Sequence, residues 1–176
     1  MRRRWSGFWL AMMLFVLFAA MPLWQLADWR SAKREKEEAV VLLYQVALFQ
    51  MEMMGSSIAQ KSAPSGTADL EEWRRALFSA AYAHERLSTA VHGSVPAKLD
   101  GLETLMQWIT RVQVGGARPL AKEEAELLKQ AAPLCSKLVA AYGRLMDGSS
   151  SISESAGSEL KKTNAELAET VKKKLK

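Results

Sequence analysis

The chain has 176 residues, with 24 Lys or Arg against 19 Asp or Glu and a formal net charge of +5. The excess positive charge lies at the two ends: without three N-terminal arginines and four C-terminal lysines, 17 basic residues face 19 acidic ones. A neutral middle argues against nucleic-acid binding, and a single cysteine, Cys135, excludes an intrachain disulfide and a multi-cysteine zinc site. The length fits one domain with appendages, held together by apolar packing.

A membrane anchor is predicted near the N-terminus. Residues 5–27 are 23 consecutive uncharged residues, 19 of them apolar, and a helix of that length spans about 34 Å, enough to cross a hydrocarbon core of about 30 Å. Arginines precede the segment, and tryptophans stand at both edges, where indole rings settle at headgroup level. The predicted membrane-interface residues are Arg2, Arg3, Arg4, Trp5, Trp9, Trp24 and Trp29.

A cleaved signal peptide is the alternative to an uncleaved anchor. We favour the anchor because the apolar stretch is longer than a signal-peptide core and lacks a good small-residue cleavage site. Basic residues are balanced on the two sides of the segment, so the expected orientation rests on the short tail, residues 1–4, whose charge lies next to the helix. We expect a cytoplasmic tail, contact with membrane lipid, and an extracytoplasmic remainder.

The segment that follows has the periodicity of a helix. Its charged beginning predicts a solvated helical stalk, and Pro64 with Gly66 predicts a turn at its end. Between Ser31 and Gln60, apolar residues recur at intervals of four and three, the spacing of a seam that packs on other helices. This first seam consists of Val40, Tyr44, Ala47, Met51, Met54 and Ile58.

Three further helices are predicted from the same spacing. The second begins at Asp69, which forms a candidate capping box with Glu72. The third starts near Pro96, since proline is favoured in the first turn of a helix. The fourth follows Pro119, and Pro133 inside it should bend it.

The predicted fold is all-α, with one N-terminal transmembrane helix followed by an extracytoplasmic antiparallel four-helix bundle. Residues 28–147 hold the stalk and the bundle, whose short connections favour antiparallel neighbours. Residues 148–158 are rich in Ser and Gly and predict a flexible linker. Residues 159–176 form a basic C-terminal tail; a thin apolar line and a candidate capping box at Thr163 predict only a marginal helix there.

We recognise no catalytic, cofactor-binding or metal-binding constellation, and we expect no small-molecule substrate. His84 and His92 stand eight residues apart without a nearby cysteine or carboxylate cluster. His84 lies on the seam of its helix, which predicts a buried histidine, with pH sensing as the other interpretation. The candidate partner contacts are Met53, which the first seam leaves out, and Lys172, Lys173 and Lys174 in the tail.

Three motifs stand in order within residues 1–145. They are Tyr44-Gln45-Val46, Trp73-Arg74 followed by Ala83-His84, and Pro119-Leu120 with Glu124 and Leu128. Together with the short tail and the anchor, this order resembles the N-terminal region of the YpeB family of spore germination proteins. Two features differ from the family: Ala121 stands where the family has a Ser or Thr that could cap the fourth helix, and a Ser-rich segment with a lysine tail stands where PepSY repeats usually follow.

The resemblance implies a non-enzymatic protein of the inner spore membrane that works with a cortex-lytic peptidoglycan hydrolase. We therefore expect a membrane-anchored interaction protein that docks or stabilises such a hydrolase. The alternative is a ligand-sensing extracytoplasmic helical bundle that acts through a membrane partner.

Overall fold

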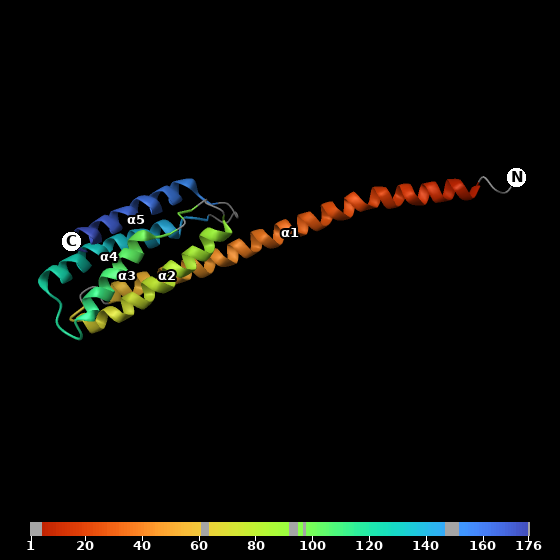
Figure 1. The fold of residues 1–176 in the computed structure, drawn as a ribbon. Coiled ribbons are helices and arrows are strands. Elements are labelled where there is room, and N and C mark those ends of the chain that lie inside the picture. The colour runs from red at the N-terminus through yellow and green to blue at the C-terminus, as the bar shows by residue number, and fades with distance from the viewer. Residues whose placement is uncertain (1–4, 61–63, 92–94, 97, 147–151, 176) are drawn as a thin grey trace. The chain divides into compact units, whose positions relative to one another are not determined.

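The computed structural model describes the backbone of residues 5–60, 64–91, 95–96, 98–146 and 152–175 (Figure 1). Within these ranges it describes the side chains of Met12 and of residues 34–174. The described part of the chain contains five α-helices, a short 3-10 helix and no strand, so the predicted all-α fold is confirmed. The chain forms two units, Met1–Ala39 and Val40–Lys176.

Helix α1 runs without interruption over Trp5–Gln60 and includes the predicted anchor, residues 5–27. Its stretch Arg34–Gln60 is long and apolar enough to cross a membrane, a property shared by signal sequences and by core helices of globular domains. The side chains of the four predicted interfacial tryptophans, and the three N-terminal arginines, lie outside the described residues.

The first two helices of the Val40–Lys176 unit bury residues at the predicted spacing of four and three. In α1, Tyr44, Ala47, Met51, Met54 and Ile58 are all buried, and Val40 packs against the core. Helix α2, Leu70–Ala90, buries Leu70, Trp73, Leu77, Ala80, His84 and Leu87. The spacing of four and three therefore identifies the core face of both helices.

Asp69 is the N-cap residue of α2, as the sequence predicts, but the predicted capping box with Glu72 is wrong. A 3-10 helix, η1 (Thr67–Asp69), precedes α2 and already places Asp69 in helical geometry, without a side-chain cap on α2. Its carboxylate instead accepts hydrogen bonds from the N–H and Oγ of Ser65, at 3.0 and 2.8 Å. Asp69 thus stabilises the turn before the helix.

Helix α3 covers Asp100–Val114. The sequence predicts its start near Pro96, and the helix begins four residues later. Helix α4, Lys122–Tyr142, is helical on both sides of Pro133. At its N-terminus, Ala121 has no side chain that can cap, but its N–H donates to Glu124 Oε2 at 2.8 Å. Arg118 holds the same carboxylate through both of its oxygens, which positions Glu124 for this contact.

The predicted four-helix bundle is incomplete, because the C-terminal segment forms a fifth helix that packs on it. Helix α5, Glu154–Leu175, begins inside the segment predicted as a linker and packs against α3 and α4. Among its described side chains, seven are buried: Ala156, Leu160, Thr163, Asn164, Leu167, Ala168 and Val171. Thr163 therefore lies in the core rather than at a helix start, and the helix begins after Ser153, whose Oγ accepts from Ala156 N–H at 3.4 Å.

Candidate interaction surface

Within the Val40–Lys176 unit, four large apolar side chains of α1 are exposed. Leu42, Val46, Phe49 and Met53 keep 62%, 56%, 56% and 48% of their surface exposed. Their spacing of four, three and four repeats that of the first seam. With about 100° between successive residues, this set points roughly opposite to the buried one. We call these four residues the α1 stripe.

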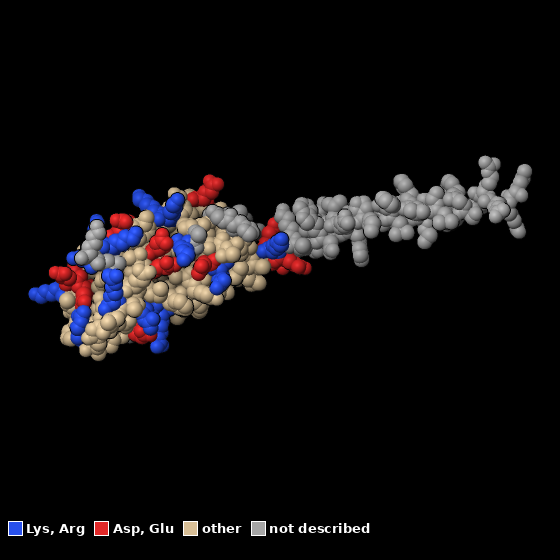
Figure 2. All heavy atoms as spheres, in the orientation of Figure 1, with Lys and Arg blue, Asp and Glu red and all other residues tan. Residues whose placement is uncertain are grey.

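The surface around the α1 stripe carries almost no charge. Between Val40 and Gln60, Glu52 is the only charged residue, and Gln45 and Gln50 are exposed or partly exposed polar neighbours. Elsewhere, on the face of the molecule in Figure 2, basic and acidic side chains are intermingled. Since a helix that is apolar on opposite faces is normally covered on both, the stripe is a candidate interface.

A second exposed feature lies on α2. Phe78 and Tyr82, 58% and 50% exposed, stack with ring centroids 6.2 Å apart. The guanidinium of Arg86 lies 4.7 Å from the centre of the Tyr82 ring, a cation–π contact. We call Phe78, Tyr82 and Arg86 the α2 ladder, because they follow one another at intervals of four along one face.

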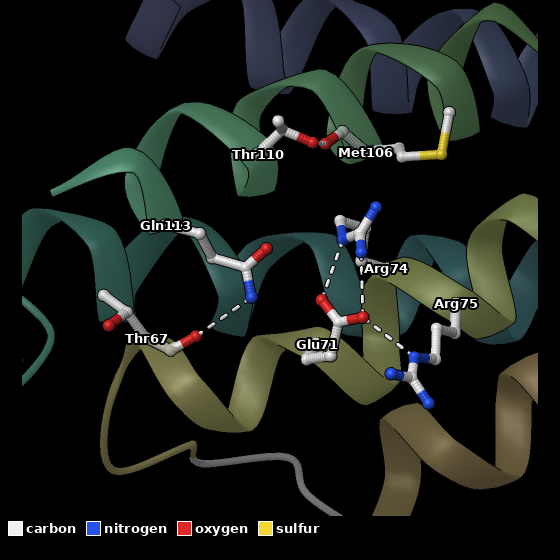
Figure 3. Close-up of polar contacts among 7 residues, drawn as sticks. All are labelled: Thr67, Glu71, Arg74, Arg75, Met106, Thr110 and Gln113. Carbon is white, nitrogen blue, oxygen red and sulfur yellow. Dashed lines mark hydrogen bonds and ion pairs between the residues drawn. The ribbon is translucent and has the colours of Figure 1, made fainter. Parts of the chain in front are cut away.

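The α2 ladder has a charged neighbour on the same face. Glu71 accepts hydrogen bonds from Arg74 at 2.9 and 2.8 Å and from Arg75 at 2.8 Å (Figure 3). These bonds, with that from Arg74 the largest cause, lower the pKa of Glu71 to about 2. The outer face of α2 therefore has an aromatic centre next to a permanently charged polar end, the arrangement of a protein interface with a polar rim.

His84 is fully buried, as its place on the seam predicts. Its Nε2 lies 2.8 Å from the carbonyl oxygen of Pro96, so Nε2 carries the proton and donates it. Its Nδ1 then accepts from the hydroxyl of Tyr142 at 3.2 Å, and Tyr44 donates to the carbonyl of Tyr142 at 2.9 Å. Burial lowers the pKa of His84, which favours this neutral form.

A surface pocket of about 600 Å³ lies beside α3 and α5. Its polar lining includes Lys98, Asp100, Lys161, Asn164 and Lys172. Positive and negative groups are mixed there, and Lys172 lies 3.9 Å from Glu169. Among the residues with described side chains, no group of three or more His, Cys, Asp or Glu is placed to hold a metal ion.

The predicted partner contacts lie on two different helices. Met53 is exposed on α1 as the last member of the α1 stripe, and Lys172, Lys173 and Lys174 are exposed in the last turn of α5. The sequence interpretation missed the other three stripe residues. Their spacing in the sequence already indicates a second apolar series that interleaves with the first seam. The first seam alone is sufficient to predict a helix, so the second series was not recognised.

Comparisons with protein-family models, curated proteins and solved structures found no match for this chain.

Proposed function

We propose that the chain is a non-enzymatic, single-pass membrane protein whose extracytoplasmic helical bundle binds a protein partner. The α2 ladder carries this proposal. Following the resemblance to the YpeB family, the partner is a cortex-lytic peptidoglycan hydrolase at the inner spore membrane, which the bundle docks or stabilises. The anchor keeps this partner next to the membrane.

The composition of the α2 ladder supports protein binding. Tyrosine and arginine are enriched among the residues that dominate binding energy, and phenylalanine is enriched in interface cores. The stacking of Phe78 on Tyr82, and of Arg86 on the same ring, orders these side chains before a partner arrives. Pre-ordered side chains lose less conformational entropy on binding than mobile ones.

The test is recovery of hydrolase by the full chain from detergent-solubilised spore membranes, read as peptidoglycan-degrading activity in the recovered fraction. The double variant Phe78→Ala, Tyr82→Ala removes the two exposed rings. We expect the affinity for the hydrolase to fall about thirtyfold, and the recovered activity to fall with it, since loss of an interface centre costs about 2 kcal/mol of binding free energy.

Val114→Ala is the matched control, because Val114 is apolar and exposed on α3. It should leave recovery unchanged. Equal recovery by the folded double variant and the unaltered chain would refute docking through the α2 ladder. No activity in any recovered fraction would refute the hydrolase as partner.

Ligand sensing is a second candidate function, favoured by the pocket beside α3 and α5. A ligand that binds only the folded state must raise the unfolding temperature. A thermal-shift screen of small anions and metabolites in which no compound stabilises the protein would count against it.

A further inference from the structure

We propose that the α1 stripe binds a second copy of this chain, forming a parallel two-fold dimer through α1. This inference rests on the membrane anchoring in the proposed function but needs no hydrolase. It starts from a helix that is apolar on two opposite faces: one covered by its own bundle, the other, the α1 stripe, about half exposed.

The α1 stripe has the register of a short coiled-coil seam. Leu42 and Phe49 take the d positions of a heptad, and Val46 and Met53 take the a positions. At one end of the seam, Val46 at a and Leu42 at d form the combination that favours two strands. The bundle covers the buried seam of α1, so a second chain can contact this part of α1 only through the α1 stripe.

The positions beside the seam fit a second copy in parallel. In a parallel dimer, a g residue of one helix faces the e residue five positions later in the other. This pairs Gln45 with Gln50 of the partner, and Glu52 with Ser57 of the partner. Both pairs can hydrogen-bond, and neither brings two like charges together.

Membrane anchoring selects this arrangement. Two chains anchored in one membrane are inserted with the same orientation, which fits a parallel pairing of the two stripe segments. A two-fold axis along the membrane normal then places each stripe residue opposite its own copy. The self-complementary contact therefore needs no change in register.

The length of the seam also requires the anchor. From Leu42 to Met53 the stripe extends about 17 Å, shorter than the three to four heptads of a self-sufficient coiled coil. Two chains in one membrane have a high effective concentration, which compensates for a short contact. We expect the dimer in membranes and much weaker association once the chain is diluted in detergent.

Disulfide cross-linking of the full chain in membrane vesicles tests the dimer. The variants Leu42→Cys and Phe49→Cys place thiols on the seam, and Val114→Cys places one at an exposed position on α3, away from the seam. The native Cys135 is fully buried, so it does not compete. Under mild oxidation we expect at least tenfold more covalent dimer from either seam variant than from Val114→Cys.

A breaking variant complements the cross-linking. Val46→Glu puts two like charges opposite each other at the seam centre, and the side chain is exposed, so the bundle should fold as before. Combined with Leu42→Cys, it should lower the cross-linking yield at least tenfold. A cross-linking yield that Val46→Glu leaves unchanged, or that is equal for Leu42→Cys and Val114→Cys, would overturn the proposal.

The two proposals fail separately. The double variant Phe78→Ala, Tyr82→Ala should leave the cross-linking yield unchanged even where hydrolase recovery is lost. If Val46→Glu abolishes hydrolase recovery and the seam variants give no covalent dimer, the α1 stripe is covered by the hydrolase, and the second-copy proposal is wrong.

Discussion

His84 joins elements that are far apart in the sequence. Its ring bonds to the carbonyl of Pro96, in the connection between α2 and α3, and to Tyr142 at the end of α4. The neutral ring satisfies both contacts, with Nε2 donating and Nδ1 accepting. A protonated ring would need an acceptor at Nδ1 as well, and the Tyr142 hydroxyl would have to give up its donated bond.

This geometry predicts that stability depends on pH near neutrality. In the unfolded chain His84 titrates with an ordinary pKa of about 6.5, whereas burial lowers its pKa in the folded protein. Between the two values only the unfolded chain binds the proton. The free energy of unfolding should therefore fall as the pH drops below about 6.5, by up to about 1.4 kcal/mol per pH unit.

Urea denaturation between pH 7.5 and 5.5 measures this slope. His84→Gln should flatten it, because it removes the group that gains the proton on unfolding. His92→Gln, which removes the other histidine, should retain it. Equal slopes for the unaltered chain and His84→Gln would mean that other groups control acid stability.

Cys135 shows the same influence of burial. Its side chain is inaccessible, and burial alone raises the pKa of the thiol to about 12. Because the thiolate is the reactive form, the native protein should react slowly with thiol reagents. A measurement of membrane orientation therefore needs a cysteine introduced at an exposed position.

At the scale of elements, the contact between α3 and α5 replaces the local cap that α3 lacks. The N–H of Gly101, in the first turn of α3, donates to Asn164 Oδ1 of α5 at 2.8 Å. The residue before the helix, Leu99, has no capping side chain. A residue 63 positions away thus serves as the N-terminal cap, which requires the two backbones to come close together.

Gly101→Ala should therefore destabilise the bundle. A Cβ at this position would lie 2.6 Å from the backbone oxygen of Asn164, closer than any real contact. Shifting α5 away would strain packing and lengthen the capping bond, at a cost of about 1–3 kcal/mol. Urea denaturation at pH 7.5 gives the difference in unfolding free energy.

Gly143→Ala is the matched control. An added Cβ there meets its nearest atom at 3.7 Å, an ordinary contact, and its φ of −62° suits alanine. Its effect should stay within about 0.5 kcal/mol. A Gly101→Ala variant as stable as this control would show that α3 and α5 do not approach so closely.

At the scale of the whole molecule, the fifth helix decides which part of the chain is the folding unit. A four-helix bundle ending at Asp147 would survive removal of everything after it. In the five-helix bundle, the same truncation uncovers the surfaces of α3 and α4 on which α5 packs. Leu160, Leu167 and Val171 would be lost, each worth about 1.5–3 kcal/mol when buried.

We therefore expect the chain ending at Asp147 to lose cooperative unfolding, since a domain is stable by only about 5–15 kcal/mol. Circular dichroism during urea denaturation in detergent measures this loss. The chain ending at Val171 removes Lys172, Lys173 and Lys174 but keeps every α5 side chain that the structure describes as buried, and it should unfold cooperatively. Cooperative unfolding of both truncated chains would favour the four-helix prediction.

The sequence by itself determined the all-α class and the core faces of α1 and α2, because a helical period in apolar residues is a local property. It underestimated α5, whose buried set includes Thr163, Asn164 and two alanines, residues that are apolar only weakly or not at all. Small and polar side chains are buried there because two helices approach closely, and that approach depends on distant residues.

Tertiary structure alone decided which apolar residues of α1 are covered. The sequence places two interleaved series at the same spacing, and nothing local distinguishes Met51 from Met53. Packing against the bundle buries one series and leaves the other, the α1 stripe, at the surface. Burial is a property of the assembled bundle, in which five helices surround one core. No local pattern in the sequence therefore distinguishes the exposed apolar residues of the candidate interfaces from the buried ones.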